Sequence, residues 1–226
     1  MLVVVIGALG KVARLLVPLL ADGEPDDAGQ AMEVVGIIRR PEQIDRVGDL
    51  GADPLLLDVE QATTEAIAAA LDGADAVVWS AGAGGGNPSR TYAVDRDAAM
   101  RSMDAAEQAG VRRYVMVSWI GSSPDHGVPS GSGFFAYADA KLAADDHLRA
   151  SALDWTILGP GTLTDDEATG RISVVPDAET PRGDDSRVPR ADVAQVVAAT
   201  LREPATIGRF IRFTAGNTPI AEALRA

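Results

Sequence analysis

Short apolar runs rich in β-branched residues alternate along this chain with longer segments in which apolar residues recur at helical spacing. The runs predict strands, and the longer segments predict amphipathic helices. The expected strands are 2–6, 33–39, 54–58, 75–81, 112–119, 154–158, 171–175 and 208–216. The expected helices are 11–21, 42–50, 64–71, 90–109, 135–151, 191–201 and 219–226. Repeated strand–helix alternation predicts right-handed crossovers and a parallel sheet.

The pattern predicts the fold class α/β, as a single domain over 1–226 built on a doubly wound parallel sheet of the Rossmann type. Of the 226 residues, 46% are hydrophobic and only 4% aromatic, which suits a core of Val, Leu, Ile and Ala between a parallel sheet and its helices. The stretch 161–190 is irregular and rich in Asp, Thr, Pro and Arg. We expect it to form a small C-terminal substrate lobe over the sheet edge.

The charge of the chain narrows the class of partner. With 20 basic and 33 acidic residues the net charge is −13, which argues against nucleic acid and against an anionic membrane surface. There is no cysteine and there are two histidines, so we expect no metal site. No segment approaches the ~20 apolar residues of a membrane span, and the apolar start is expected to be a first strand, which favours a cytoplasmic location. A small-molecule substrate is the expected partner, and the oligomeric state stays open.

The stretch "VVVIGALGKVARLLVPLL" places glycines between the first strand and the first helix. In a doubly wound sheet this helix start can hold a pyrophosphate on its free N–H groups. Gly7 is expected to permit the tight exit, Gly10 to let phosphates approach the backbone, and Ala13 to allow close packing. The same GxxGxxA spacing also occurs in turns without a ligand, but its place after the first strand favours dinucleotide binding.

Arg39 and Arg40 stand at the end of the second strand, where a basic residue suits a 2′-phosphate and an acid suits a ribose hydroxyl. The pair favours NADP(H), with Arg39 first and Arg40 second, over two solvated surface arginines. Asp58 ends the third strand and is expected either to accept from the adenine amino group or to cap a turn. The glycines in 80–86, after the fourth strand, are expected to let the cofactor pass over the backbone.

Tyr137 and Lys141 lie one helical turn apart in the helix expected over 135–151. A lysine beside a phenol favours the phenolate and so lowers its pKa, which lets the tyrosine exchange a proton near neutral pH. Ser118 ends the fifth strand and is expected to hold a substrate carbonyl beside the tyrosine. Such YxxxK pairs also occur on surface helices. Nearby aromatic residues are expected either to wall a substrate pocket or to anchor a lid: Trp119, Phe134 and Phe135.

The chain resembles the short-chain dehydrogenases/reductases, and more narrowly their atypical, compact NAD(P)H-binding branch. The glycine turn and YxxxK are shared widely, whereas "AAEQAGVRRYVMVS" and "LRASALDWTILGPGTLT" are more specific to this branch. Other matching segments include "GIIRRPEQ", "LLLDVE", "PRADVAQVVAATL" and "GNTPIAEAL", so the resemblance covers nearly the whole length.

The resemblance implies an NADP(H) site in the glycine turn, made of Gly7, Ala8, Leu9, Gly10, Lys11 and Val12. The 2′-phosphate would meet Arg39 and Arg40, the adenine Asp58 and Val59, and the ribose Ala81 and Gly82. The nicotinamide would lie by Pro160 and Gly161, and the reductase triad would be Ser118, Tyr137 and Lys141. Gly159 departs from the pattern, because the family often has an arginine before this Pro-Gly pair.

Together these features predict an NADP(H)-dependent oxidoreductase of the short-chain type that transfers hydride to a small carbonyl or similar acceptor. A first alternative is a non-catalytic NADP(H)-binding redox sensor, since the branch includes proteins without known turnover. A second alternative is a sugar-nucleotide epimerase or dehydratase, against which the short C-terminal lobe speaks.

Overall fold

A mixed sheet of nine strands organises the computed structural model, which describes residues 1–23, 32–176 and 186–226. The strand order across the sheet is β11-β8-β10-β6-β5-β4-β1-β2-β3. The strands are β1 (Leu2–Ile6), β2 (Glu33–Ile38), β3 (Asp53–Leu56), β4 (Ala76–Trp79), β5 (Arg113–Val117), β6 (Asp154–Pro160), β8 (Arg171–Val174), β10 (Arg209–Ala215) and β11 (Thr218–Pro219). In the spatial order of the sheet, β10, β6, β5, β4, β1, β2 and β3 are parallel to one another. At the β10 edge, β8 pairs antiparallel with both β10 and β11. The Rossmann-type prediction is confirmed, with an antiparallel edge that the sequence pattern did not indicate.

The direction of winding reverses at β1. The chain moves from β1 outward to β2 and β3, then crosses back so that β4 pairs with the other side of β1, with Val3 opposite Ala76 and Ile6 opposite Trp79. The loops that follow β1 and β4 therefore leave the sheet side by side. In open α/β sheets this switch point is where ligands bind.

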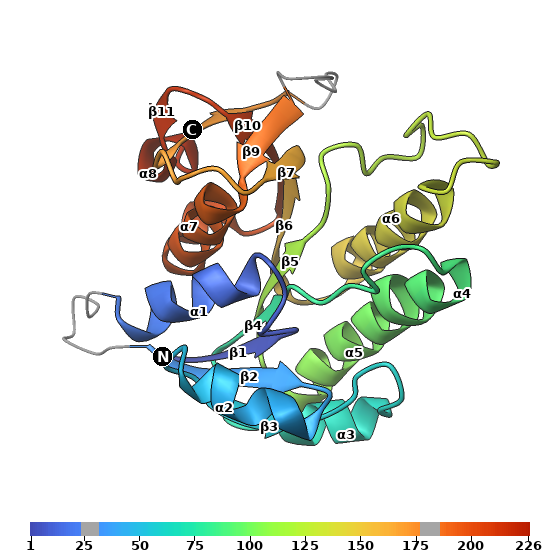
Figure 1. Ribbon diagram of the computed structural model, residues 1–226, viewed down its shortest axis with the longest axis vertical. Coiled ribbons are helices and arrows are strands. Elements are labelled where there is room, and N and C mark those ends of the chain that lie inside the picture. Colours follow the sequence, from blue (N-terminus) through green and yellow to red (C-terminus); the bar gives the residue numbers. More distant parts are fainter. Residues whose placement is uncertain (24–31, 177–185) are drawn as a thin grey trace.

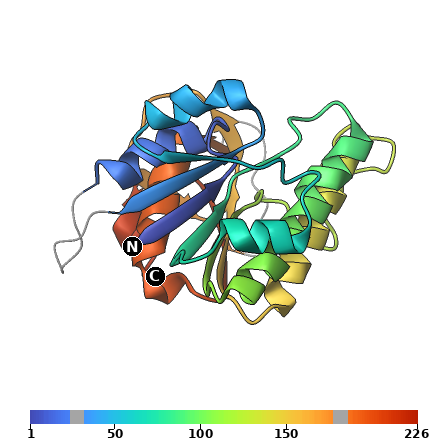
Figure 2. The same cartoon turned by 90° about the horizontal axis from the view of Figure 1, so that it is seen from below.

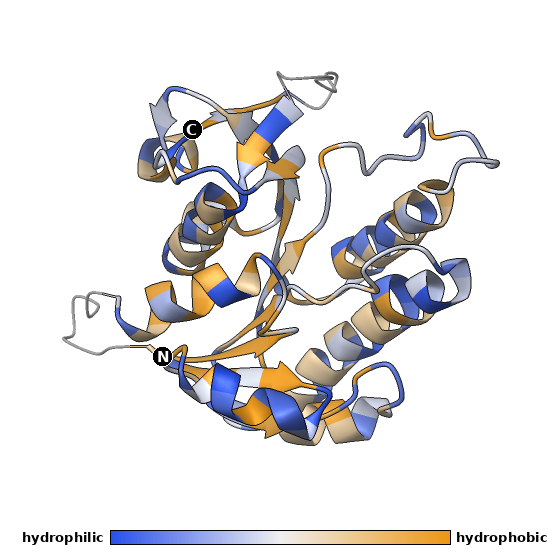
Figure 3. Ribbon diagram, in the orientation of Figure 1, coloured by the Kyte–Doolittle hydropathy of each residue, from blue (hydrophilic) through white to orange (hydrophobic). Residues whose placement is uncertain are grey.

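Helices cover both faces of the sheet (Figures 1 and 2). The helices are α1 (Ala13–Ala21), α2 (Ile44–Gly48), α3 (Thr64–Ala70), α4 (Pro88–Thr91), α5 (Ala99–Ala109), α6 (Phe135–Ala150), α7 (Arg190–Arg202) and α8 (Ile220–Ala223). Side chains alternate along β1, so that Val3 and Val5 pack with α1 and α7, whereas Val4 and Ile6 pack with α3 and α5. Figure 3 shows the central strands as largely hydrophobic, as expected for strands buried on both faces.

The expected helix over 90–109 is divided in three. It starts as α4, widens into a π-helix over Tyr92–Ala98 and continues as α5. Apolar spacing alone could not reveal the widened turn, because it changes the side-chain register of only one segment. The expected helix over 11–21 likewise begins only at Ala13, after the glycine turn.

The expected lobe over 161–190 lies partly outside the described residues. Its described parts are β7 (Thr162–Thr164), β8 and β9 (Arg187–Pro189), of which β7 and β9 form a separate two-stranded parallel ribbon. The 22–30 loop lies outside the described residues from position 24 onward. None of the helices in the described ranges is long and apolar enough to cross a membrane.

Candidate active site

The glycine turn after β1 is pressed against the loop after β4. Gly7 adopts φ +85°, and a Cβ there would lie 2.6 Å from the Cα of Ala81. A Cβ on Gly10 would lie 3.1 Å from the carbonyl oxygens of Gly7 and Ser80. The N–H of Gly10 donates to the carbonyl of Gly7 at 2.8 Å, which closes the turn. Both glycines are therefore required by the close approach of two backbones, as well as by any ligand above them.

The start of α1 is open to an anion. In the described part of the chain no side chain caps this helix end, and no acidic residue stands in its first turn. Ala13 is fully buried and lets the helix pack tightly on the sheet. Free N–H groups and the helix dipole favour a phosphate at such an end. A pyrophosphate fits this arrangement, because Gly7 has no side chain to block its approach and the end of α1 carries no side-chain cap.

A cavity of about 290 Å³ opens at the carboxyl ends of β1 to β4. The expected cofactor residues that line it are Gly7, Leu9, Gly10, Arg39, Asp58, Val59, Ala81 and Gly82. Expected residues outside this lining, among those the structure describes, are Ala8, Lys11, Val12, Arg40, Pro160 and Gly161. Ala8 and Val12 are buried in the core and Lys11 is exposed. The structure thus brings the expected pyrophosphate, adenine and ribose residues to one cavity.

The two arginines after β2 take different directions. Arg39 lines the cavity, and its Nη1 lies 4.0 Å from Oε2 of Glu60. The Nε of Arg40 lies 3.3 Å from Glu42 instead, and its backbone N–H donates to the side chain of Gln43. Arg40 is paired within its own turn, so the structure favours Arg39 for contact with a bound cofactor.

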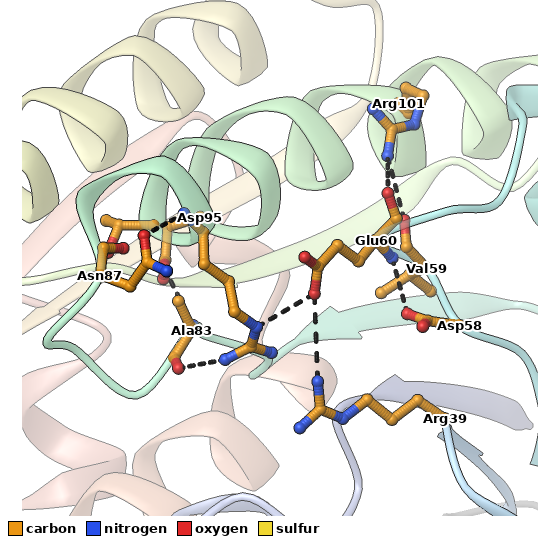
Figure 4. Close-up of polar contacts among 10 residues, drawn as sticks. Arg39, Asp58, Val59, Glu60, Ala83, Asn87, Asp95 and Arg101 are labelled. Atoms are coloured by element: carbon orange, nitrogen blue, oxygen red, sulfur yellow. Dashed lines mark hydrogen bonds and ion pairs between the residues drawn. The ribbon is translucent and has the colours of Figure 1, made fainter.

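The sequence analysis missed two arginines at this site: Arg90, which lines the cavity, and Arg101, which lies behind its lining. Arg90, in α4, donates through Nε to Oε2 of Glu60 at 3.1 Å and through Nη1 to the carbonyl of Ala83 (Figure 4). Arg101 holds the Glu60 loop from behind by donating to the carbonyls of Val59, Glu60 and Ala62, each at 3.1 Å. The contacts with Val59, Glu60 and Ala62 span 30 to 42 residues of sequence, so no local pattern indicates them.

Asp58 caps a turn, one of the two roles left open for it. Its Oδ1 accepts the backbone N–H of Glu60 at 3.1 Å. The residue also lines the cavity, so its contact with adenine stays a prediction.

Tyr137, Lys141 and Asp145 succeed one another at four-residue spacing on α6 and so share a face. Lys141 is 1% exposed, and its Nζ donates to the carbonyl of Val117 at 2.7 Å. Burial lowers the pKa of Lys141, and the negative charges of Asp145 and Asp95 raise it by a smaller amount. The carboxylates partly compensate the ammonium, which is held at the carboxyl end of β5.

Ser118 is engaged by Asp145, a residue the sequence analysis did not single out. The hydroxyls of Ser118 and Ser122 donate to Oδ2 of Asp145 at 2.5 and 2.6 Å. Oδ1 of Asp145 is buried without a hydrogen-bond partner among the described residues. Burial raises the pKa of Asp145, whereas Lys141 and the two hydroxyls lower it. The expected triad is therefore part of a larger buried polar cluster.

Asp95 joins this cluster to the cofactor cavity. It lies in the π-helix, and its Oδ2 accepts the backbone N–H of Ala83, a cavity residue, at 3.0 Å. Burial raises the pKa of Asp95, and the charge of Lys141 lowers it. A π-helical turn re-aims a side chain and is frequent at functional sites. Asp95 thus contacts the Gly-rich loop and faces the buried lysine.

The environment of Tyr137 differs from expectation in one respect. Burial raises the pKa of Tyr137, and the charges of Asp95 and Asp145 raise it further. The lowered pKa expected from the spacing to Lys141 is not found, because the ammonium is turned toward Val117 and compensated by the two carboxylates. Tyr137 is accordingly held in its protonated form.

Aromatic rings surround Tyr137. Its ring centroid lies 5.0 Å from that of Phe134 and 6.5 Å from that of Trp119, and the latter two are 5.2 Å apart. His126 adds a ring 6.5 Å from Trp119 and 5.8 Å from Phe135. The aromatic residues after β5 therefore cluster beside the tyrosine, and their roles as a pocket wall or a lid anchor both stay predictions.

Gly159 stands where an arginine was expected from the resemblance, and the structure supplies one from the next strand. Arg212 of β10 is in register with Gly159, and its guanidinium lies 3.9 Å above the ring of Phe210. It donates to the carbonyls of Ile120 and Ser122 at 3.1 and 3.0 Å. A Cβ at Gly159 would lie 2.5 Å from the Phe210 ring, so no larger residue fits.

The Pro-Gly pair that follows is held by backbone contacts. The carbonyl of Pro160 accepts from Ile120 at 2.9 Å, and the N–H of Gly161 donates to Phe213 at 2.9 Å. A Cβ at Gly161 would overlap the carbonyl oxygen of Ser186. The contact of this pair with a nicotinamide stays a prediction. Across the described ranges no three His, Cys, Asp or Glu residues are grouped so as to hold a metal ion.

Comparison with known proteins agrees with this geometry. A Bacillus subtilis protein named as an uncharacterized sugar epimerase is 38% identical over 100% of this chain and 99% of its own. A Bacillus halodurans structure named as an NAD-dependent epimerase/dehydratase superposes with a TM-score of 0.87 at 33% identity, over 99% of this chain and 98% of that one. The anaerobillin reductase ChuY of Escherichia coli gives a TM-score of 0.73 at 26% identity, over 96% and 98%.

The family model described as NAD(P)H-binding matches residues 7–204, from the glycine turn to the end of α7. This match covers most of the chain, including the cavity and the Tyr137–Lys141 face. The resemblance to the atypical branch of the short-chain dehydrogenases/reductases is confirmed, and the chain belongs to the NAD(P)H-binding family.

Proposed function

We propose that this protein is an NADP(H)-dependent oxidoreductase of the short-chain type, which reduces a small carbonyl compound or a similar acceptor. The observation that carries the proposal is the contact of Asp95 with the cavity residue Ala83, together with the effect of the Lys141 charge, which lowers the pKa of Asp95. The nucleotide cavity and the proton-donating residues are thus parts of one site. Arg39 in the cavity lining supports NADP(H) over NAD(H).

A cofactor held by the glycine turn and the loop after β4 would supply the hydride that reduces the carbonyl carbon. Tyr137 donates its phenolic proton to the carbonyl oxygen, so the product is an alcohol and the tyrosine is left as phenolate. For Lys141 to stabilise that phenolate by its charge, its ammonium must turn from the carbonyl of Val117 toward the tyrosine. The aromatic wall of Trp119 and Phe134 excludes water from the tyrosine.

Titration of the purified protein with NADPH and NADH, followed by cofactor fluorescence, tests the first half of the proposal. We expect both to bind, with NADPH tighter. A panel of carbonyls, quinones and flavins, followed by NADPH oxidation, tests the second half. Tyr137→Phe should abolish turnover while NADPH still binds, and full turnover by this variant would overturn the role of Tyr137.

A sugar epimerase is the second candidate, because one relative is named a sugar epimerase and another an NAD-dependent epimerase/dehydratase. An epimerase oxidises and reduces the same substrate, so it consumes no cofactor overall. Cofactor retained through purification, together with interconversion of nucleotide sugars without net NADPH oxidation, would favour it over the reductase. A redox sensor would instead show equal affinity for NADP and NADPH and no turnover.

A further inference from the structure

Two guanidinium groups meet on one carboxylate oxygen at the wall of the nucleotide cavity. Oε2 of Glu60 lies 3.1 Å from Nε of Arg90 and 4.0 Å from Nη1 of Arg39 (Figure 4). All three residues line the cavity. Arg39 comes from the end of β2, Glu60 from the loop after β3, and Arg90 from α4, so the group joins three separate segments.

Neighbouring residues hold the group in place. Arg90 is anchored by the carbonyl of Ala83, and its backbone N–H donates to Oδ1 of Asn87 at 3.2 Å. Arg101 fixes the backbone of the Glu60 loop. Arg90 is partly buried, whereas the side chain of Arg39 is 44% exposed. The positions of Arg90 and Glu60 are thus set before any ligand arrives, and Arg39 keeps freedom to move.

The charges of the group suit a phosphate better than a hydroxyl. Arg39, Arg90 and Glu60 together carry a net charge of +1, and Asp58 in the same lining brings the total to zero. A phosphate monoester dianion is a stronger partner for a guanidinium fork than a single carboxylate is. Arg40, the residue expected from sequence to assist Arg39, is paired with Glu42 instead.

Building on the proposed function, we propose that Arg90 is the second cation for the 2′-phosphate of NADP(H), opposite Arg39. Glu60 is the internal anion that holds both guanidinium groups until the phosphate replaces it. The preference for NADP(H) over NAD(H) is therefore set by three residues that are distant in the sequence. Glu60 weakens this preference because it competes with the phosphate for both arginines.

Calorimetric titration with NADPH, NADH and 2′,5′-ADP tests the proposal without any substrate. Arg90→Gln should weaken binding of NADPH and 2′,5′-ADP roughly tenfold, the size expected for one lost charge-assisted hydrogen bond, and change NADH binding little. Arg39→Gln should act in the same direction. Glu60→Gln should tighten NADPH relative to NADH. Arg46→Gln, on the exposed surface of α2, is the control for a lost positive charge.

The outcomes separate this inference from the proposed function. If the wild-type protein binds neither NADPH nor NADH, the proposed function is overturned. If it binds NADPH and Arg90→Gln weakens NADPH and NADH equally, Arg90 is only a wall of the cavity and the inference alone is overturned. A larger loss in Arg40→Gln than in Arg90→Gln would overturn it as well. Circular dichroism melting of each variant verifies that the fold persists, and Arg90→Lys, which keeps the charge, should recover part of the NADPH affinity.

Discussion

The hydroxyl oxygen of Ser118 lies 2.5 Å from Oδ2 of Asp145 and donates its proton to that carboxylate. Ser122 donates to the same oxygen, so an ionised Asp145 engages both hydroxyl protons. In this arrangement Ser118 has no proton left to offer a substrate carbonyl. When Asp145 is protonated it can donate to one serine and release a hydroxyl proton toward the substrate. The part that Ser118 takes in catalysis therefore depends on the protonation of Asp145.

Removing the Asp145 carboxylate should destabilise the fold. Asp145→Ala leaves the buried hydroxyls of Ser118 and Ser122 without their acceptor, and it leaves Lys141 without one of its two counter-charges. We expect the free energy of unfolding to fall by roughly 3 kcal/mol. Urea unfolding measures it. The adjacent Asp146→Ala, on the exposed side of α6, is the control and should stay within about 0.5 kcal/mol of wild type. Equal losses in the two variants would contradict the buried-cluster interpretation.

The same carboxyl should make stability depend on pH. Burial raises the pKa of Asp145 in the folded state, so the folded protein binds this proton more tightly than the unfolded chain does. Its contribution to the free energy of unfolding is complete below about pH 4 and is lost as the pH rises through the folded-state pKa. Wild type should thus lose stability relative to Asp145→Asn as the pH rises from about 4. An opposite trend would show that the folded-state pKa is lowered.

The tyrosines of the cofactor-free protein should resist ionisation. The chain has three, and burial raises the pKa of Tyr92, Tyr114 and Tyr137 alike. Ultraviolet titration near 295 nm should therefore show no tyrosinate below about pH 10. One tyrosinate per chain near pH 8, lost in Tyr137→Phe, would mean that Lys141 does lower the pKa of Tyr137.

The glycine turn should tolerate no side chain at Gly7. Gly7→Ala places a side chain at φ +85°, with its Cβ 2.6 Å from the Cα of Ala81. We expect the free energy of unfolding to fall by about 3 kcal/mol and NADPH binding to be lost. Gly73→Ala is the matched control, since Gly73 has φ +73° but open space around its Cβ. It should lose only the ~1–2 kcal/mol of left-handed strain and bind NADPH normally. Similar losses in both variants would show that the contact with the loop after β4 is unimportant.

Features that depend on residues close together in the chain could be predicted from the sequence, and contacts between residues far apart in the chain could not. The glycine turn, the strand alternation and the Tyr137–Lys141 spacing are local, and the fold and family that they predicted are confirmed. Asp95, Glu60 and Arg90 act through partners 12 to 30 residues away, which only folding brings together. Arg40 is adjacent to Arg39 in sequence, yet the turn after β2 directs it to Glu42. Two adjacent side chains can therefore have different partners where a backbone turn separates them, and the contact of Arg40 with a cofactor stays a prediction.

Arg212 has a consequence for how the chain matures during synthesis. The strands that flank the nucleotide cavity, β1 to β4, are complete once residue 79 has left the ribosome. The loop at Ile120 and Ser122 must wait for a guanidinium 90 to 92 residues further on. Because a domain generally folds as a unit, the loop after β5 gains this brace only after β10 has emerged, close to the end of synthesis. A chain truncated before β10 should therefore leave the carbonyls of Ile120 and Ser122 without their guanidinium donor.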